Sequence, residues 1–263
     1  MNANLVAIVT GGARGIGEAA VRKFSELGYA VAVLDVNRVL GEALAQDLLA
    51  HGKPAAFYAC DVADALAVDQ LAAEIEKNMG SASVLVTSAA LIPNTESIME
   101  MDLEAHDRMW RVNYHGTVHA CRSFGRQMIA AKGGSIVTLG SINSVLPLPL
   151  PAYNPGKAAI GRLTQLLASE LGRHGIRVNS VAPTYVMTPQ LQARIDAGQR
   201  DLAKMMQSHA LDFLPTPADI ADAMAFLCSP SARAVTGILL PVDSGWMASA
   251  TYMTYAGGVP WDA

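Results

Sequence analysis

The most constraining feature of this sequence is a regular alternation between two kinds of segment. Short runs rich in β-branched residues, bounded by Gly, Asp or Pro, recur between longer segments rich in Ala and Leu. This alternation is typical of a parallel sheet whose strands are joined by crossover helices. Most of the short runs are continuously apolar, as expected when helices cover both faces of the sheet. Seven strands are predicted, at 5–10, 29–35, 55–60, 83–88, 135–140, 177–182 and 237–242.

Helices are predicted between these strands, at roughly 15–27, 39–51, 64–79, 102–131, 152–173 and 217–228. The order of elements predicts an α/β fold, a doubly wound (Rossmann-type) seven-stranded parallel sheet with helices on both faces. Because no linker or repeat interrupts the alternation, residues 1–263 are predicted to form a single domain. Two segments interrupt the alternation of strands and helices. The Leu-Pro run at 146–151 cannot lie inside a helix or a sheet, and the insertion at 187–214 is predicted to form a lid.

Composition and charge exclude several classes of protein. A hydrophobic content of 51% argues against disorder, and no apolar stretch approaches the ~18 residues that a membrane-spanning helix needs. The net charge is −4 and no basic cluster occurs, so neither nucleic acid nor an anionic membrane is an expected partner. Three widely spaced cysteines indicate neither a disulfide framework nor a metal site. The first residues do not resemble a signal peptide, and a cytoplasmic location is predicted.

A glycine-rich segment at 10–17 directly follows the first predicted strand and opens the first predicted helix. Gly11, Gly15 and Gly17 allow the backbone to turn sharply and to approach a pyrophosphate, which the free N–H groups of the helix would stabilise. The spacing is Gly-x-x-x-Gly-x-Gly rather than the commoner Gly-x-Gly-x-x-Gly. Its position between a strand and a helix favours a dinucleotide site over an ordinary structural turn.

Asp35 closes the second predicted strand, where a carboxylate can accept both ribose hydroxyls of an adenosine. The alternative is a carboxylate that caps the following helix. If Asp35 faces the ribose, its charge repels a 2′-phosphate and favours NAD over NADP. Arg14 acts in the opposite sense, because its guanidinium could pair with that phosphate, although it could instead pair with Asp35 or a backbone carbonyl. Asp35 carries the greater weight, and NAD is the predicted cofactor.

Tyr153 and Lys157 are four residues apart at the start of a predicted helix, so both side chains lie on one helix face. A free phenol has a pKa of ~10, and a nearby ammonium lowers it by favouring the phenolate. Ser141 ends the preceding predicted strand at the same edge of the sheet, where its hydroxyl can donate to a substrate oxygen. Asn113, in the long helix at 102–131, is a fourth polar candidate. Its alternative role is that of a satisfied interior amide.

Together these motifs resemble the short-chain dehydrogenase/reductase family over residues 5–245. The resemblance implies that Tyr153 is the catalytic acid/base and that Lys157 binds the nicotinamide ribose as well as tuning Tyr153. It further implies that Ser141 polarises the substrate oxygen and that Asn113 anchors a water of a proton relay. The implied cofactor-binding residues are Gly11, Arg14, Gly15, Ile16, Gly17, Asp35, Asp61, Val62, Ser88, Ala89, Ala90, Tyr153, Lys157, Pro183, Val186 and Thr188.

The chain also departs from the pattern of that family. Residues 87–90 read Thr-Ser-Ala-Ala where the family usually has Asn-Asn-Ala-Gly, and Thr184 replaces the usual Gly after Pro183. Pro155 is compatible with the helix only if it lies in the first turn, where backbone N–H groups have no intrahelical partner. None of these departures removes a catalytic group.

The predicted function is hydride transfer between NAD(H) and a secondary alcohol or ketone, with a slight preference for a polyol or another hydroxylated small molecule. One alternative is NAD(H)-dependent reduction of a bulkier cyclic, aromatic or 3-oxoacyl-type ketone. The other is a non-catalytic NAD-binding module, for which the fold would suffice and the four catalytic groups would be superfluous. The predicted substrate pocket has Asn143 as its polar group and Leu148, Tyr185 and Met187 as walls.

A homotetramer is the predicted assembly. Only 16% of the residues are charged, and the helices at 102–131 and 152–173 carry apolar residues on more than one face. In the related family these two helices form a contact between subunits. The aromatic residues of the tail at 246–263 are expected to dock across such an interface, near the pocket of a neighbouring subunit.

Overall fold

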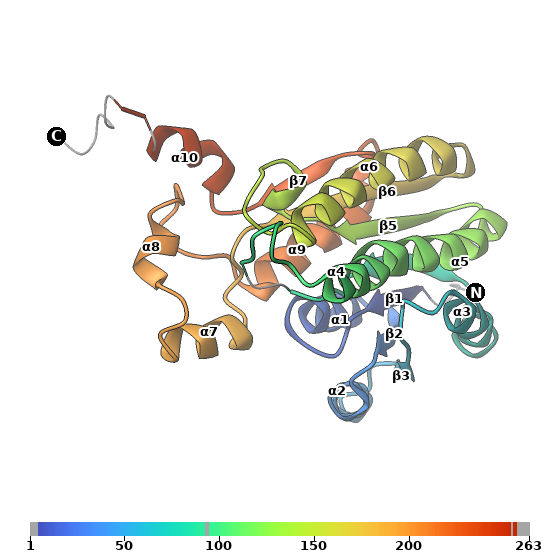
Figure 1. Ribbon diagram of the computed structural model, residues 1–263. Coiled ribbons are helices and arrows are strands. Elements are labelled where there is room, and N and C mark those ends of the chain that lie inside the picture. Colours follow the sequence, from blue (N-terminus) through green and yellow to red (C-terminus); the bar gives the residue numbers. More distant parts are fainter. Residues whose placement is uncertain (1–4, 93–94, 254, 257–263) are drawn as a thin grey trace.

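The computed structural model describes residues 5–92, 95–253 and 255–256 (Figure 1). Its centre is a seven-stranded sheet in which every neighbouring pair is parallel, in the order β3-β2-β1-β4-β5-β6-β7. The predicted doubly wound fold is confirmed. The strands are β1 (Val6–Thr10), β2 (Ala30–Asp35), β3 (Ala55–Ala59), β4 (Ala82–Thr87), β5 (Gly134–Leu139), β6 (Ile176–Pro183) and β7 (Leu239–Val242).

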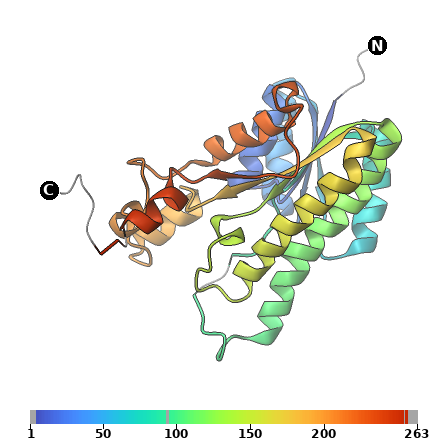
Figure 2. The same cartoon turned by 90° about the horizontal axis from the view of Figure 1, so that it is seen from above.

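Helices cover both faces of this sheet (Figure 2). One face carries α3 (Ala65–Met79), α5 (Gly116–Ala131) and α6 (Tyr153–Leu171), and the other carries α1 (Gly15–Glu26), α2 (Arg38–Ala50) and α9 (Pro217–Cys228). The remaining helices are α4 (Leu103–Trp110), η1 (Arg111–His115), η2 (Ile142–Ser144), η3 (Gly172–His174), α7 (Pro189–Asp196), α8 (Leu202–Met206), η4 (Pro230–Ala232) and α10 (Trp246–Met253).

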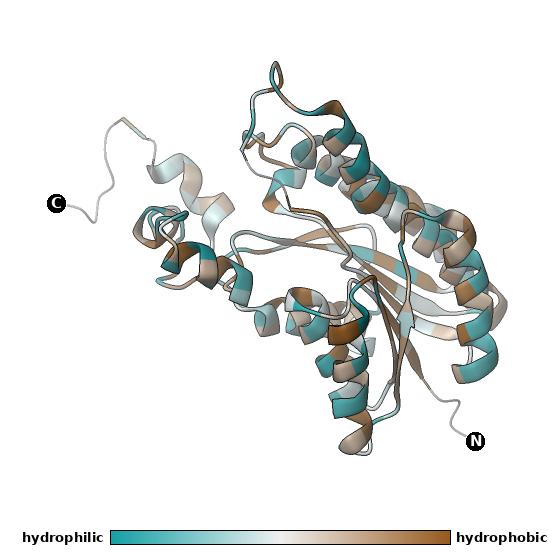
Figure 3. Cartoon of the chain, turned by 60° about the horizontal axis from the view of Figure 1, so that its bottom comes forward, coloured by the Kyte–Doolittle hydropathy of each residue, from teal (hydrophilic) through white to brown (hydrophobic). Residues whose placement is uncertain are grey.

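Two apolar cores lie between the sheet and its helix layers. Successive strand side chains point to opposite faces, so Ile8 belongs to the core under α3, α5 and α6, whereas Val9 belongs to the core under α1, α2 and α9. Both side chains are fully buried. The amphipathic helices appear as alternating teal and brown stripes in Figure 3. Burial on both faces explains why the strands read as continuous apolar runs.

The strand order places the point where the chain changes direction between β1 and β4. The connection from β1 leads outward to β2 and β3, and the chain then returns to pair β4 on the other side of β1. In open α/β sheets, ligands bind beyond the carboxyl ends of the strands at such a point. The glycine-rich turn after β1 and the segment 88–90 after β4 therefore lie where a ligand is expected.

The predicted elements agree with the observed ones to within about two residues at most ends, with three differences. The helix predicted at 102–131 is interrupted by the π-helical turn η1 at Arg111–His115. The predicted lid contains two helices, α7 and α8. The tail begins with α10, and its last part, 257–263, lies outside the described residues. Within the described ranges, no helix is long and apolar enough to span a membrane.

Candidate active site

Ser141 and Tyr153 lie on two elements that are joined by hydrogen bonds. Ser141 lies two residues beyond the end of β5 and caps η2, and Tyr153 is the first residue of α6. Ser144 connects the two elements, because its hydroxyl donates to the carbonyl of Lys157 (2.8 Å) and accepts from the N–H of Ser141 (3.3 Å). Pro155 lies in the first turn of α6, as the sequence requires. The loop and the helix are thereby held in register.

The pKa values of Tyr153 and Lys157 are moved by burial. Burial raises the pKa of Tyr153 to about 12, while a hydrogen bond with Ser141 acts in the opposite direction. Burial lowers the pKa of Lys157 to about 7. The ammonium lies 5.3 Å from the centre of the Tyr153 ring and donates to the carbonyl of Leu139. The expectation that Lys157 lowers the pKa of Tyr153 does not hold in this structure, because both groups are desolvated and Lys157 bonds elsewhere.

Asn113 lies in the π-helical turn η1, against which α6 packs. Its side-chain oxygen accepts from the N–H of Leu91 (2.7 Å), and its side-chain nitrogen donates to the carbonyl of Leu91 (3.0 Å). The main-chain carbonyl of Asn113 accepts from the hydroxyl of Thr117 (2.8 Å). The amide is thus satisfied, as the alternative interpretation expected, and it fixes the segment after β4 to the helix that carries η1.

The glycine-rich turn is closely packed against the end of β4. A Cβ atom on Gly11 would lie 2.6 Å from the Cα atom of Ala89, and one on Gly17 would lie 1.9 Å from the carbonyl oxygen of Gly11. Gly15 has a φ of +59°, and a Cβ atom there would lie 3.8 Å from the methyl group of Thr188. The structure therefore brings the turn, the end of β4 and the start of the lid together, as expected of a dinucleotide site.

Asp35 ends β2 beside this turn and fixes its shape. One carboxylate oxygen accepts from the N–H of Ala13 (3.0 Å), and the other accepts from the N–H of Asn37 (2.9 Å). Asn37, not Asp35, caps α2, so the alternative of a capping aspartate is wrong. Arg14 is exposed and makes no ion pair within the described part of the chain, so it does not pair with Asp35. Within the residues that the structure describes, the half-buried carboxylate has no cationic partner at this edge of the sheet.

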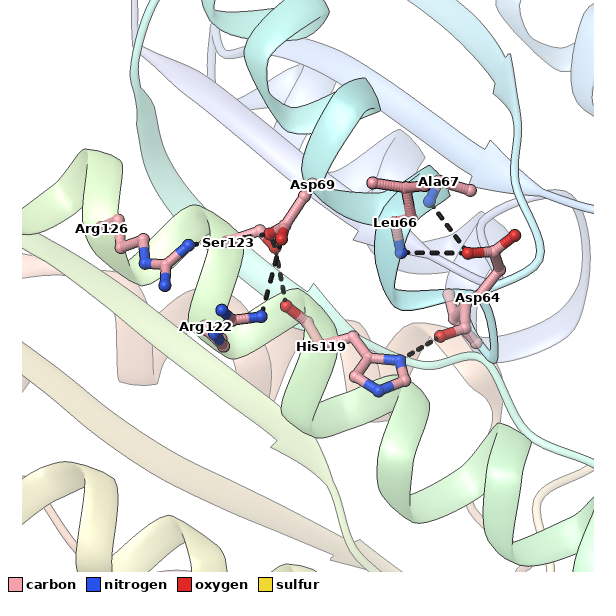
Figure 4. A network of polar contacts seen from close by, with 9 residues as sticks. Asp64, Leu66, Ala67, Asp69, His119, Arg122, Ser123 and Arg126 are labelled. Carbon is pink, nitrogen blue, oxygen red and sulfur yellow. Dashed lines mark hydrogen bonds and ion pairs between the residues drawn. The ribbon is translucent and has the colours of Figure 1, made fainter.

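The segment that follows β3 is anchored to α5 (Figure 4). The ring of His119 donates to the carbonyl of Val62 (2.9 Å), and Asp69 on α3 bonds the hydroxyl of Ser123. This hydrogen bond lowers the pKa of Asp69, and Arg122 also pairs with its carboxylate (3.5 Å). Val62 is buried, whereas Asp61 is exposed, its carboxylate accepting from the N–H of Ala63 (2.9 Å).

Two buried hydroxyl groups at the carboxyl ends of the strands have no hydrogen-bond partner in the described chain. They belong to Thr87, at the end of β4, and Thr184, directly after β6. Thr184 follows Pro183, whose carbonyl lies 3.5 Å from the Ser141 hydroxyl. Buried polar atoms are nearly always paired, so an unpaired hydroxyl beside Ser141 fits a polar group such as a carboxamide. With the glycine turn, these residues fit a nicotinamide dinucleotide.

The four predicted pocket residues have different surroundings. Asn143 is buried, with its amide nitrogen donating to Ser141 (3.1 Å) and its amide oxygen accepting from Asn154 (3.1 Å), so both ends of this amide are occupied. Leu148 and Met187 are half-buried, and Tyr185 is 40% exposed. Asn154 and Ser144 were not predicted from the sequence, because only their long-range contacts distinguish them from other polar loop residues.

A groove of about 920 Å³ lies at the opposite edge of the sheet, at the amino ends of the strands. Leu5, Ser83 and Arg177 are among its lining residues, and none of the predicted site residues lines it. We place the chemistry at the carboxyl edge instead, because the polar groups described above converge there.

Comparisons with known proteins agree with this geometry. Residues 11–247 match a family model described as Enoyl-(Acyl carrier protein) reductase. Galactitol 2-dehydrogenase from Rhizobium johnstonii is 38% identical over 248 residues, which cover 91% of this chain and 94% of that protein. D-threitol dehydrogenase from Mycolicibacterium smegmatis is 33% identical, with 92% of each chain covered.

A crystal structure gives the same result. An oxidoreductase of the short chain dehydrogenase/reductase family from Burkholderia thailandensis superposes with a TM-score of 0.85 at 32% identity, covering 93% of each chain. The chain therefore belongs to the short-chain dehydrogenase/reductase family and is an oxidoreductase that acts on CH–OH groups.

Proposed function

We propose that this chain is an NAD-dependent dehydrogenase that oxidises a secondary alcohol of a polyol or a similar hydroxylated small molecule. The observation that carries the proposal is the hydrogen-bonded connection between Ser141 and the first turn of α6, which holds Tyr153 and Lys157 at the same edge of the sheet. The activities named for the galactitol and threitol dehydrogenases support a polyol as the substrate.

The catalytic roles follow from the chemistry of each side chain. The bound nicotinamide dinucleotide would supply the hydride acceptor. Ser141 donates a hydrogen bond to the substrate oxygen, and Tyr153 takes the hydroxyl proton of the alcohol as general base. Lys157 would hold the nicotinamide ribose, and its ammonium lies 5.3 Å from the centre of the Tyr153 ring. Asn113 would anchor a water of the proton relay.

The remaining predicted site residues would hold the dinucleotide. The turn with Gly11, Gly15 and Gly17 would bind the pyrophosphate, helped by Arg14 and Ile16. Asp35 would accept the ribose hydroxyls, and its uncompensated charge disfavours a 2′-phosphate. The adenine would lie at Asp61 and Val62, the segment Ser88–Ala90 would lie along the dinucleotide, and Pro183, Val186 and Thr188 would face the nicotinamide. Thr184 would add a hydrogen bond to its carboxamide.

The deciding experiment measures NADH formation when the purified chain is given NAD and a panel of alcohols. Galactitol, threitol, cyclic alcohols and aromatic carbinols form the panel, and NADP replaces NAD in a parallel series. We expect oxidation of a polyol with NAD, and its loss in Tyr153→Phe. A Tyr153→Phe variant as active as the wild type would refute the acid/base role.

A second candidate is NAD(H)-dependent reduction of a bulkier ketone. The family model that matches is named for an enoyl thioester of acyl carrier protein, and a 3-oxoacyl thioester is the ketone of the same class of compound. Consumption of NADH with such a thioester, without oxidation of any polyol, would replace the first proposal with this one.

The assembly and the location also belong to the proposal. Leu103 on α4 and Leu166 on α6 are 68% and 61% exposed, which is unfavourable in water and favours burial between subunits of a homotetramer. The segment 187–214 would act as a lid over the substrate, with Leu148, Tyr185 and Met187 lining the pocket. We expect the protein to act in the cytoplasm.

A further inference from the structure

The two shorter hydrogen bonds of the Ser141 hydroxyl are both bonds that its oxygen accepts. Its hydroxyl oxygen accepts from the backbone N–H of Asn143 (3.2 Å) and from the side-chain nitrogen of Asn143 (3.1 Å). A serine oxygen has two lone pairs, and both are therefore occupied. The Ser141 hydroxyl can therefore make a further hydrogen bond only as a donor, through its hydrogen. Ser141 and Asn143 are each 6% exposed, so water does not compete freely for these contacts.

The orientation of the Asn143 amide is set by Asn154, the residue after Tyr153. The side-chain nitrogen of Asn154 donates to the carbonyl of Leu146 (2.6 Å) and to the amide oxygen of Asn143 (3.1 Å). A backbone carbonyl can only accept, so the nitrogen of Asn154 must face Leu146. The oxygen of Asn143 must then face Asn154, and its nitrogen must face Ser141. The direction of each bond is thus determined by the Leu146 carbonyl.

We propose that Asn143 and Asn154 are positioning residues that commit the Ser141 hydroxyl to donating a hydrogen bond to the reacting oxygen. The inference rests on the proposed function, because it assigns a role within that site. The hydroxyl hydrogen has the carbonyl of Pro183 within reach, at the long distance of 3.5 Å, and the phenol of Tyr153. Little is lost when it turns from the distant carbonyl to a substrate oxygen.

Restricting the Ser141 hydroxyl to the role of donor matters because a serine hydroxyl can either donate or accept a hydrogen bond. A hydroxyl that accepts from the substrate alcohol would leave the developing negative charge on that oxygen without a donor. Donors that are oriented before the reaction stabilise this charge without further reorganisation. The irregular Leu-Pro segment at 146–151 thereby gains a function. The carbonyl of Leu146, its first residue, fixes one end of the chain of hydrogen bonds that leads through Asn154 and Asn143 to Ser141.

The test is a double-mutant cycle with Ser141. Asn143→Leu and Asn154→Leu replace each amide with an apolar side chain of similar size, in the wild-type background and in Ser141→Ala. Loss of a whole donor to the reacting oxygen typically lowers kcat by ~10²–10³, and we expect Ser141→Ala to do so and each asparagine variant to lower kcat about tenfold. In the Ser141→Ala background, we expect neither asparagine variant to lower kcat further.

A matched control is Gln127→Met on α5. Gln127 is also a buried amide that bridges two backbone groups, at Ala72 and Ala82, but it lies away from the site. We expect this variant to lower the Tm and leave kcat unchanged. The affinity for NADH, measured by fluorescence, should stay constant in all asparagine variants. Thermal melting identifies any variant that does not fold, and the corresponding alanine variant then takes its place.

The substrate for the cycle is the alcohol that the wild-type chain oxidises fastest. If Ser141→Ala is impaired but the asparagine losses multiply with it, or if Asn143→Leu is as fast as the wild type, only this inference is overturned. If the wild-type chain oxidises no alcohol of the panel, the proposed function fails, and the inference fails with it.

Discussion

At the scale of single residues, Lys157 shows how burial changes a group whose identity was plain from the sequence. The four-residue spacing predicted that Tyr153 and Lys157 share a helix face, and they do. The direction of the pKa shifts could not be predicted, because it depends on how much solvent the surrounding fold removes. With 2% exposure and a pKa of about 7, Lys157 is a cation below pH 7, where its burial lowers the stability of the cofactor-free protein.

This cost depends on pH, and Lys157→Met should reveal it. The unfolded chain keeps the Lys157 proton up to its ordinary pKa of 10.5, whereas the folded chain releases it near 7. Below pH 7 the full cost is therefore present, and it is relieved as the pH rises from 7 to 10.5. We expect Lys157→Met to raise the Tm at pH 6 by about 4–8 °C, for about 2 kcal/mol, and by less at pH 9.5.

The control for this prediction is Lys204→Met, which changes an exposed lysine on α8. Its effect on the Tm should be small and should not vary between pH 6 and pH 9.5. Equal destabilisation by Lys157→Met at both pH values would contradict the assignment of a buried cation.

Thr184 makes a second prediction at this scale, because its buried hydroxyl has no partner in the described chain. Thr184→Val keeps the shape and removes the unpaired group, which should stabilise the cofactor-free protein by about 1 kcal/mol. The same change should weaken NADH binding, since the hydroxyl is proposed to bond the carboxamide. Thermal melting and fluorescence titration measure the two effects.

Ser25→Ala provides the comparison. Ser25 on α1 is 1% exposed, and its hydroxyl also lacks a partner, but it lies at the end of α1 remote from the glycine turn. We expect a similar gain in Tm without a change in NADH affinity. If Thr184→Val binds NADH as tightly as the wild type, the proposed contact is wrong.

At the scale of elements, the sequence predicted the strands and helices well where local patterns determine them. All seven strands and the order of the covering helices follow from apolar runs and their spacing. The π-helical turn at Arg111–His115 could not be predicted, because the apolar periodicity passes through it without a break. The turn carries a long-range contact, the pairing of Asn113 with Leu91. The chain of hydrogen bonds from Leu146 to Ser141 could not be predicted either, because it also depends on long-range contacts.

The contact between Asn113 and Leu91 should be important for stability. Asn113→Leu removes two hydrogen bonds and leaves the half-buried backbone groups of Leu91 without these partners, which we expect to cost about 1–3 kcal/mol. Thr117→Val removes only the hydroxyl that bonds the Asn113 carbonyl and should cost less, about 1 kcal/mol. Denaturant unfolding measures both. Hydrogen exchange at the Leu91 amide should become faster in Asn113→Leu and stay slow in Thr117→Val.

At the scale of the whole molecule, the apolar groups left exposed outline where other subunits would pack. Leu103 and Leu166 lie on α4 and α6, and Phe226, on the opposite layer, is 47% exposed. A chain with few charges and such faces on both layers is suited to an assembly with more than one type of interface. We therefore expect light scattering to give a particle of four times 27.6 kDa.

The tail should couple this assembly to substrate binding. Asp243 caps α10 through the N–H groups of Gly245 and Met247, and α10 then extends away from the sheet on the side of α8 (Figures 1 and 2). Tyr255 beyond it is 69% exposed, and Trp261 lies outside the described residues. An anchored helix that carries aromatic groups away from its own core is suited to packing on a neighbouring subunit.

Truncation after Gly245 tests this coupling, because it keeps β7 and Asp243 and removes α10 with the aromatic groups. We expect the shortened chain to dissociate from the tetramer at concentrations where the full chain stays assembled, and its KM for the alcohol to rise. Tyr255→Ser should produce a smaller shift of both quantities in the same direction. An unchanged mass and an unchanged KM after truncation would exclude docking of the tail on a neighbour. A raised KM with an intact tetramer would instead confine its contact to the lid of its own subunit, through α7 and α8.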